Sequence, residues 1–482
     1  MEPYLLRDFS GGQITEVVDT LLPTNAMRLI ENMDVDVVGG LRVRRGSTAI
    51  GDQLEDGKTI LGLYNFIDAG SGSNSQQIAV VNNASDSQSI LEYNSSGTWT
   101  GISGGSSQTA GAKHRFATFL DRVFVVNSAF NTPLSWDGNP SNPLGSTQLS
   151  SAPSGQFVIA YKSRLYIVGT LANPDRVLFS SIISAAGNIT WDTTNDYLDV
   201  NPSDGREGGD ITGVAKNGTL LLIFKDRGMY RWNGASTDPE LVIDVGCSSH
   251  ESIATRNGIT FFFNPFGIYA TNGGQPKRLS APIQRWIGAI SGSYYQHVSG
   301  ACDEDNYYCS IGDVTVDGET FNNVVLVYGL STRTWRVYTF PEQVRILANF
   351  INSDSTEGIM LGNDDGDVLQ FNSGNTDTGT GINYRVKTKR IDFGIPWIQL
   401  KHFTDVSAFG DGLAEARTNV YTDSDSRPKS IRELLSSLWQ RMRGYKFRGR
   451  WFEFELQGRS VEGRGLFHGW EIADVDLGDM AP

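Results

Sequence analysis

A group of short apolar strands, punctuated by aromatic residues, recurs seven times between residues 58 and 374. The fourth copy is the clearest, because the apolar run Leu220–Phe224 is followed after a turn by Gly228–Trp232. Seven copies give about 45 residues each, the length of one four-stranded blade of a β-propeller. Strands buried between neighbouring blades are apolar on both faces, which explains why these runs do not alternate. The repeat therefore predicts a β-propeller, whereas a tandem of β-sandwiches fits the even spacing less well.

The number of blades stays open at six or seven, since an N-terminal strand could complete the last one. The seven units contain the runs Ile60–Tyr64, Arg115–Phe119, Phe157–Ala160, Leu220–Phe224, Ile259–Phe263, Val324–Tyr328 and Ile346–Phe350. Composition agrees with an all-β chain, because 54 of the 482 residues are glycine and 24 Phe, 17 Tyr and 10 Trp accompany them. Glycine usually makes up about 7% of a protein, and tight turns between short strands use more. The length predicts two or three domains.

A second domain is expected after the repeat. The stretch Asn372–Gly381 is rich in Gly, Thr and Asn and lacks apolar residues, so residues 375–382 are interpreted as a linker. Beyond it, Asn383–Phe393 and Phe447–Leu456 alternate as strands do, whereas Ser430–Met442 has apolar residues at helical spacing. Residues 383–482 therefore predict a β-sandwich-like domain that carries one helix.

The first 57 residues predict a short lead-in to the propeller, which would occupy residues 58–374. Thr24 can cap a helix that presents Met27, Leu29 and Ile30, and the alternating run Leu41–Arg45 then predicts a strand with basic residues on one face. Local pattern alone indicates nothing more than an ordinary N-terminal helix and edge strand.

The order of these parts resembles that of the tail nozzle and tail hub proteins of short-tailed bacteriophages, the tail tubular B-like, packaged-DNA-stabilising proteins. The resemblance covers nearly the whole chain, and the order of its short motifs carries most of the weight. Those motifs are Asp8–Gln13, Asn32–Asp36, Gly39–Gly46, Gly246–Gly274, Thr388–Gly394, Lys401, Tyr421–Asp423 and Arg448–Phe452.

The resemblance implies a structural virion protein that forms the ring-shaped lower tail channel, most often from six copies, and that retains and then passes genomic DNA during ejection. Its implied partners are other copies of itself, the tail adaptor, tail fibre, needle or plug proteins, and passing double-stranded DNA bound without sequence specificity. Its implied location is the virion tail, after assembly in the host bacterial cytoplasm.

Charge is distributed unevenly along the chain. The net charge is −14, which argues against gripping DNA through its phosphates. Residues 380–482 contain 16 basic and 14 acidic side chains, whereas residues 1–379 contain 24 and 40. We therefore expect an acidic wall that keeps DNA from sticking and an arginine-rich end that contacts other subunits or the adaptor. The expected contact residues are Phe9, Arg42, Arg44, Arg448, Arg450 and Trp451, with intrachain salt bridges or strand packing as the alternative for each.

Catalytic and metal-binding patterns are weak. Gly101–Gly105 matches Gly-x-Ser-x-Gly around Ser103, but a nucleophile elbow needs a strand before it and a helix after it. The acidic groups Asp303–Asp305 and Asp364–Asp367 could supply carboxylates for glycoside cleavage or calcium, yet their neighbours are turn-formers. His114, His250, His297, His402 and His468 lack metal-ligand spacing. We predict no enzyme activity, no cofactor and no metal.

Three further observations complete the expectations. The odd number of cysteines (Cys247, Cys302 and Cys309) fits reduced, buried thiols, and neither a secretory signal nor a membrane-spanning run is visible.

The alternative function from another class is a propeller that binds or cleaves host glycans, with exposed Trp or Tyr and carboxylates clustered at one propeller mouth. A peptide-binding scaffold propeller is the third.

Overall fold

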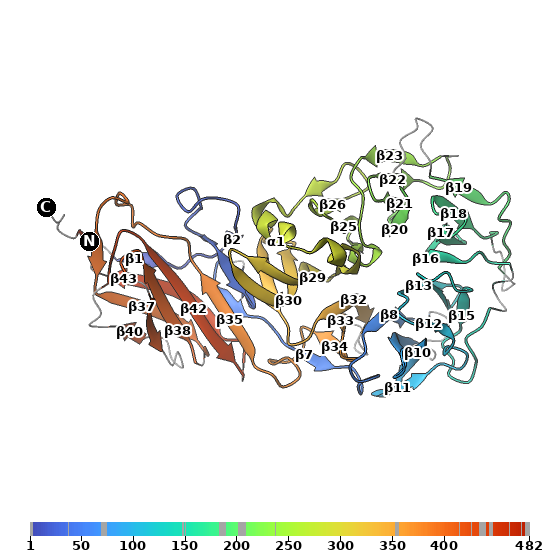
Figure 1. Ribbon diagram of the computed structural model, residues 1–482, viewed down its shortest axis with the longest axis horizontal. Helices are drawn as coiled ribbons and strands as arrows, with labels where there is room; N and C mark the ends of the chain where they lie inside the picture. The colour runs from blue at the N-terminus through green and yellow to red at the C-terminus, as the bar shows by residue number, and fades with distance from the viewer. Residues whose placement is uncertain are drawn as a thin grey trace.

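The protein consists of a ring of small antiparallel sheets and a β-sandwich that lie end to end along the long axis (Figure 1). The computed structural model describes residues 3–477 except 37, 69–74, 147, 148, 150, 183–188, 201–208, 237, 352–355, 414, 426, 433–439, 443–446, 462 and 474. Strands dominate the described residues. The helical elements are α1 (Gln284–Gly288), η1 (His250–Ser252), η2 (Ala281–Ile283) and η3 (Gly292–His297).

Seven sheets form the propeller, and the first strand of each contacts the first strand of the next around the ring. The first two blades are β8 (Ile60–Phe66), β9 (Gln76–Asn82), β10 (Gln88–Ser95), β11 (Thr98–Gly101) and β12 (Gln108–Thr109), then β13 (His114–Phe119), β14 (Arg122–Asn127) and β15 (Leu134–Trp136). The third and fourth are β16 (Gly155–Tyr161), β17 (Arg164–Thr170), β18 (Arg176–Phe179) and β19 (Tyr197–Asp199), then β20 (Ile211–Asn217), β21 (Leu220–Lys225), β22 (Met229–Trp232) and β23 (Glu240–Ile243).

The remaining blades complete the circle. The fifth is β24 (Ala254–Arg256), β25 (Ile259–Asn264), β26 (Gly267–Thr271) and β27 (Lys277–Arg278), and the sixth is β28 (Ser299–Cys302), β29 (Asn306–Val316), β30 (Glu319–Gly329) and β31 (Trp335–Thr339). The seventh combines β32 (Val344–Ile351), β33 (Glu357–Asn363) and β34 (Val368–Phe371) with the N-terminal strand β7 (Ser47–Ala49). The predicted propeller is confirmed, and the N-terminal strand settles the blade number at seven.

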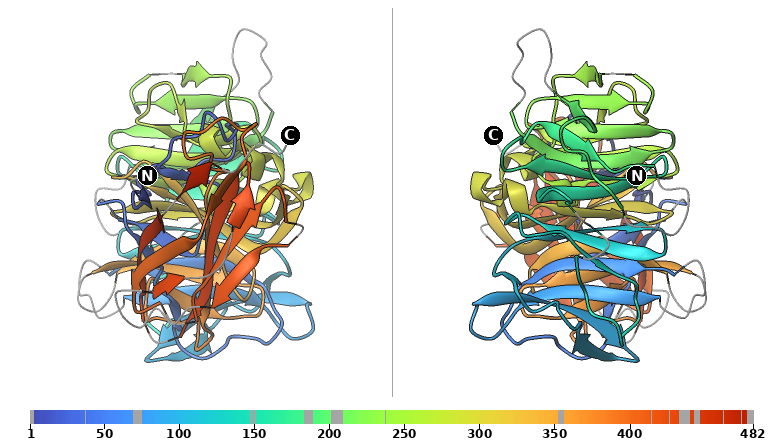
Figure 2. Two further views of the ribbon diagram at one scale, coloured as in Figure 1. Left: turned by 90° about the vertical axis from the view of Figure 1, so that its left-hand side faces the viewer. Right: turned by 90° about the vertical axis from the view of Figure 1, so that its right-hand side faces the viewer.

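Both ends of the chain build the sandwich, which faces the viewer in the left-hand view of Figure 2. Its N-terminal strands are β1 (Tyr4–Leu6), β4 (Leu29–Glu31), β5 (Met33–Val35) and β6 (Leu41–Val43), with the short pair β2 (Gly12–Gln13) and β3 (Ala26–Met27) beside them. Its C-terminal strands are β35 (Ile382–Lys387), β36 (Lys401–Phe403), β37 (Asp405–Asp411), β38 (Arg417–Thr422), β39 (Lys429–Arg432), β40 (Gln440–Met442), β41 (Phe447–Gly449), β42 (Phe452–Ser460), β43 (Leu466–Ala473) and β44 (Asp476–Leu477).

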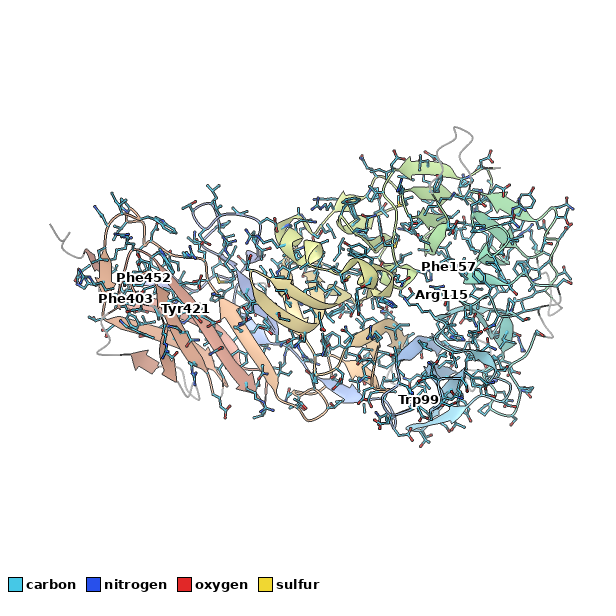
Figure 3. The ribbon with its side chains drawn as sticks, in the orientation of Figure 1. Trp99, Arg115, Phe157, Phe403, Tyr421 and Phe452 are labelled. Atoms are coloured by element: carbon cyan, nitrogen blue, oxygen red, sulfur yellow. The ribbon has the colours of Figure 1, made fainter. Side chains whose placement is uncertain are left out.

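The predicted N-terminal lead-in is therefore part of the second domain. Strands β1 and β6 both pair with β43, near the other end of the chain. Their shared core is aromatic, with Phe9 and Trp470 at 0% exposure and ring centroids 6.3 Å apart. Phe403 and Phe452 pack 4.7 Å apart in the same core (Figure 3). The first 46 residues consequently belong with residues 375–477 rather than in a separate segment.

Two predicted helices are wrong where the structure describes them. Residues Thr24–Ile30 form β3 and β4, because β4 lies between β31 and β35 and pairs on both sides. The segment Ser430–Met442 begins in β39 and ends in β40, which pair with β38 and β37. Residues 433–439 lie outside the described residues. Non-local pairing has overridden the helical spacing at both sites.

The predicted linker is held tightly at its centre. Asp377 is 4% exposed, and its carboxylate accepts two hydrogen bonds from the guanidinium of Arg44, at 3.0 and 2.5 Å. The remaining N–H groups of Arg44 donate to Asn32 Oδ1 at 2.8 Å and to the carbonyl oxygens of Arg45 and Thr339, both at 2.9 Å. This one side chain ties the N-terminal segment, the sixth blade and the linker together.

Candidate functional site at the domain junction

One continuous sheet crosses from the propeller into the sandwich. It contains nine strands in the order β28-β29-β30-β31-β4-β35-β42-β38-β39. The step across the junction is made by β4, which pairs in parallel with β31 through Glu31 and Val337 and antiparallel with β35 through Glu31 and Arg385. The sixth blade and the sandwich therefore share one sheet, which crosses the junction at the pair Glu31 and Val337.

The sandwich part of this sheet has an unusually polar face beside the propeller. Arg385 Nε donates to Glu31 at 3.1 Å, and Lys387 pairs with Glu453 at 2.8 Å. Glu455, only 4% exposed, accepts hydrogen bonds from Asn419 Nδ2 at 2.8 Å and from the hydroxyl of Tyr421, labelled in Figure 3, at 2.6 Å. Buried charges need such partners, because an uncompensated one would be very costly.

Burial has a larger effect than the ion pairs on the pKa values of Glu31 and Glu453 on this face. It raises the pKa of Glu31, although Arg385 and Thr339 oppose the change. Burial likewise raises the pKa of Glu453, although Lys387 opposes it. The tip of the β29–β30 hairpin covers part of the face, with the Phe321 ring 5.3 Å from the Arg385 guanidinium.

Two grooves lie on either side of that hairpin tip, and Glu319 and Phe321 line both. The first, which we call the Arg417 groove, has a volume of about 640 Å³. It is lined by Glu31, Thr320, Asn322, Thr339, Phe340, Asn383, Tyr384, Arg385, Glu415, Arg417, Gln457, Gly458 and Arg459 besides the two shared residues. Three acidic and three basic side chains thus share this groove.

The second, which we call the Trp286 groove, has a volume of about 580 Å³. It is lined by Thr15, Val18, Asp19, Thr20, Arg28, Leu29, Arg285, Trp286, Val316, Asp317, Lys387, Arg390, Trp397 and Glu453 besides the two shared residues. The Trp286 ring packs 4.8 Å from that of Phe321. Its indole N–H is buried and has no hydrogen-bond acceptor among the residues that the structure describes.

Two of the six predicted contact residues are enclosed by the chain itself. Phe9 is in the sandwich core beside Phe467, and Arg44 is fully buried against Asp377. Neither side chain offers surface to a partner, so the alternative of intrachain packing and salt bridging applies to both. Arg44 was expected on the same exposed strand face as Arg42, but its strand β6 ends at Val43 and the arginine turns inward.

The other four predicted contact residues are at the surface. Arg42, Arg448 and Arg450 are exposed, and Trp451 is half-buried with its ring 4.5 Å from the guanidinium of Arg390. Since Arg390 lines the Trp286 groove, Trp451 borders that groove. The structure therefore brings only part of the predicted set to the domain junction.

The axis of the propeller is crossed by ion pairs. Arg115 and Lys113, from the second blade and the residue before it, reach Glu251 of η1, which precedes the fifth blade, at 2.8 and 3.1 Å. Arg115 also lies 4.5 Å from the Phe157 ring of the third blade, and Figure 3 places both near the centre of the ring. Arg115 and Lys113 hold the pKa of Glu251 well below its usual range despite burial.

The candidate catalytic residues occupy turns and packed interiors. Ser103 follows β11 in a turn that leads to β12, a setting that differs from a strand-to-helix elbow. Asp303 accepts backbone hydrogen bonds from Asp305 at 2.9 Å and Asn306 at 2.6 Å, as a turn residue does. Burial lowers the pKa of His250 to about 3 and that of His114 to about 4.

Across the described ranges, no group of three or more His, Cys, Asp or Glu side chains is arranged to hold a metal ion. Within the same ranges, no helix combines the length and apolar character that crossing a bilayer requires. All three cysteines are free and buried.

Three exposed apolar side chains on the two loops that line the Trp286 groove were not singled out from the sequence. Val18 is 61%, Leu21 is 74% and Ile398 is 83% exposed. A signal existed in the run Ile395–Ile398, because an apolar stretch directly after a Gly turn is unusual for a solvated loop. Its proximity to Val18 and Leu21 depends on the pairing of the two chain ends and could not be inferred.

Comparison with known proteins finds solved structures that resemble this chain in fold but share little sequence identity with it. No family model and no curated protein matches the sequence. The structure is similar to that of YCF48 bound to D1 peptide (11% identity, TM-score 0.42, covering 67% of this chain and 94% of that one). It is also similar to a chain of the mitotic checkpoint complex (9%, 0.41, 68% and 94%) and to the AfRom2 CNH domain (10%, 0.39, 67% and 98%). The chain is an all-β propeller protein with a sandwich built from both of its ends.

Proposed function

We propose that this chain is a structural subunit of the tail of a short-tailed bacteriophage, where copies of it form the nozzle or hub ring that retains genomic DNA and then passes it during ejection. The observation that carries the proposal is the nine-stranded sheet, which joins propeller and sandwich without a break. A channel wall that confines packaged DNA needs subunits that resist bending, and a continuous sheet supplies that resistance through its hydrogen bonds.

The distribution of charge between the two bodies supports the same proposal. The propeller, residues 47–374, contains 19 Lys and Arg against 32 Asp and Glu, or −13. The rest of the chain contains 21 and 22, or −1. An acidic body repels passing phosphates, whereas a neutral body can approach other proteins without repulsion. This division suits a subunit that lines a DNA path with one part and is anchored through the other.

The alternative of a glycan-recognising propeller has less support. It expects exposed Trp or Tyr side chains and carboxylates clustered at one propeller mouth. Every Trp and Tyr of the propeller that the structure describes is buried or half-buried. We therefore retain the structural role as the proposal.

The deciding experiment measures the mass of the purified chain, alone and mixed with its tail adaptor, by sedimentation velocity and native mass spectrometry. We expect a closed ring of defined stoichiometry in at least one of the two samples. A chain that remains monomeric in both samples contradicts the proposal, and glycan binding or hydrolysis by that monomer would favour the alternative.

The acidic surface has its own test. Blade seven contains Asp364, Asp365 and Asp367, which together raise the pKa of Glu342 in addition to burial. Their replacement by lysine should slow DNA ejection from reconstituted virions, because phosphates would then bind along the path. Ejection at the wild-type rate would show that this surface does not face the DNA.

A further inference from the structure

We propose that the Trp286 groove and its apolar rim form a contact between two copies of this chain. The inference rests on the proposed function, which requires contacts between copies but does not say where they lie. We define the rim as Val18 and the half-buried Trp397, which line the groove, together with the exposed Leu21 and Ile398 on the same two loops. Exposed apolar side chains that gather beside a groove mark protein interaction sites more often than isolated ones do.

Two loops far apart in the sequence bring the rim together. The loop that carries Val18 and Leu21 is fixed to the segment before Trp397 by Lys389, whose ammonium donates to the carbonyl oxygen of Leu22. Arg390 lies 3.9 Å from Asp19 of the same loop. The rim is therefore presented by anchored segments, so little conformational entropy is lost when a partner covers it.

Charge favours a second copy over a basic partner. Four acidic and four basic side chains line the groove, and the acidic ones are matched within the chain. Arg28 pairs with Asp19 at 2.6 Å, Arg285 with Asp317 at 2.7 Å and Lys387 with Glu453 at 2.8 Å. The last acid, Glu319, pairs with Arg385.

Copies with a net charge of −14 repel each other across most of their surfaces. They can associate where the surface is neutral and apolar, as it is around this groove. A basic foreign partner would instead be drawn to the propeller, whose net charge is −13. The neutral groove thus suits a like-charged neighbour better than an oppositely charged one.

The first test compares the assembly of rim and control variants. Leu21→Asp combined with Ile398→Asp should weaken self-association at least tenfold in sedimentation velocity, because each change places a charge in an apolar contact. The control is Leu171→Asp on the third blade, whose leucine is 77% exposed and thus matches Leu21. It should assemble as the wild type does, and thermal unfolding should give the same midpoint for all three proteins.

A second measurement does not depend on breaking the contact. Leu21→Cys, labelled with benzophenone maleimide, should photo-crosslink into dimers and larger ladders of this chain, since the three native cysteines are buried and stay unlabelled. Leu171→Cys should give monomer only.

The outcomes separate this inference from the proposed function. If the wild type forms rings and the Leu21→Asp, Ile398→Asp variant forms them equally well, the contact lies elsewhere and only this inference falls. If the label on Leu21→Cys captures the adaptor instead of a second copy, the inference is likewise overturned. If the wild type never forms a ring, alone or with its adaptor, the proposed function itself fails.

Discussion

Asp377→Asn removes the carboxylate that faces the fully buried guanidinium of Arg44. The pair is bidentate, at 3.0 and 2.5 Å, and the two side chains are 0% and 6% exposed. The Arg44 guanidinium also lies 4.5 Å from the Phe340 ring, so water cannot replace the lost carboxylate without disrupting the packing. The substitution therefore leaves a positive charge in the interior with only neutral hydrogen-bond acceptors.

The cost follows from the burial. Breaking a buried ion pair by removing one partner costs about 3–5 kcal/mol, because the remaining charge stays desolvated. For a cooperative unit of this length the entropy of unfolding is about 1 kcal/mol per kelvin, which converts the loss into a fall of about 3–5 °C in the melting midpoint. Arg44→Met combined with Asp377→Leu removes both charges and should recover most of the loss.

Thermal and urea unfolding of the wild type, Asp377→Asn, the singles Arg44→Met and Asp377→Leu, and the double variant that combines these two singles measures these values. A surface pair with similar bidentate geometry, Arg231 and Glu240 at 2.9 and 2.8 Å, supplies the control. Glu240→Gln should leave the midpoint unchanged, because that carboxylate is solvated. The reasoning is refuted if Asp377→Asn behaves like the control or if the effects of the Arg44 and Asp377 substitutions simply add.

Three further predictions concern the titratable groups and the two chain ends. Burial lowers the pKa of His250 to about 3 and of His114 to about 4, so the unfolded chain binds these protons first as the pH falls below about 6.5. Each histidine should therefore remove about 2 kcal/mol of unfolding free energy between pH 7 and pH 5, and urea titrations with equal midpoints at both pH values would contradict this. Burial raises the pKa of Cys247 and Cys309 to about 12, so these thiols should resist a thiol reagent at pH 8 in the native protein and react only in urea. Rapid labelling of the two cysteines in the native protein would show that the core opens. The isolated segment 383–482 should lack a near-ultraviolet circular dichroism signal, because β43 loses its neighbours β1 and β6, and β35 loses β4. Joining residues 1–46 to 375–482 through a short linker should restore that signal. A folded isolated segment would overturn the assignment of the N-terminal strands to the sandwich.

The propeller could be predicted because its information is local. Each blade forms from strands adjacent in sequence, so apolar runs such as Leu220–Phe224 and the turns between them are enough to count the units. The closure by β7 was foreseeable only as an alternative, because β7 pairs with β34 more than 300 residues away. Nothing in the sequence around Ser47 distinguishes it from any other short polar strand.

The sandwich could be predicted only in part, for the same reason. Its C-terminal strands alternate visibly, but β4 reads as a helix until its neighbours β31 and β35 are known. The burial of Arg44, one of the candidate contact residues, was missed for the same reason. Arg42 and Arg44 look equivalent two positions apart, yet Asp377, 333 residues later, draws only Arg44 into the interior. Residue type indicated an arginine-rich contact region, and only tertiary structure separates its structural arginines from its surface ones.

The pairing of β1 with β43 has a consequence for biosynthesis. Tyr4 lies opposite Ile472, so β1 leaves the ribosome 468 residues before the strand with which it pairs. At about 5–20 residues per second, the early strand waits about 23–94 seconds for its partner. During that time the propeller blades can close one after another, while the sandwich stays unformed. A chain truncated before β43 can therefore not complete the sandwich or the neutral surface at the junction, and only finished copies would enter an assembly built through it.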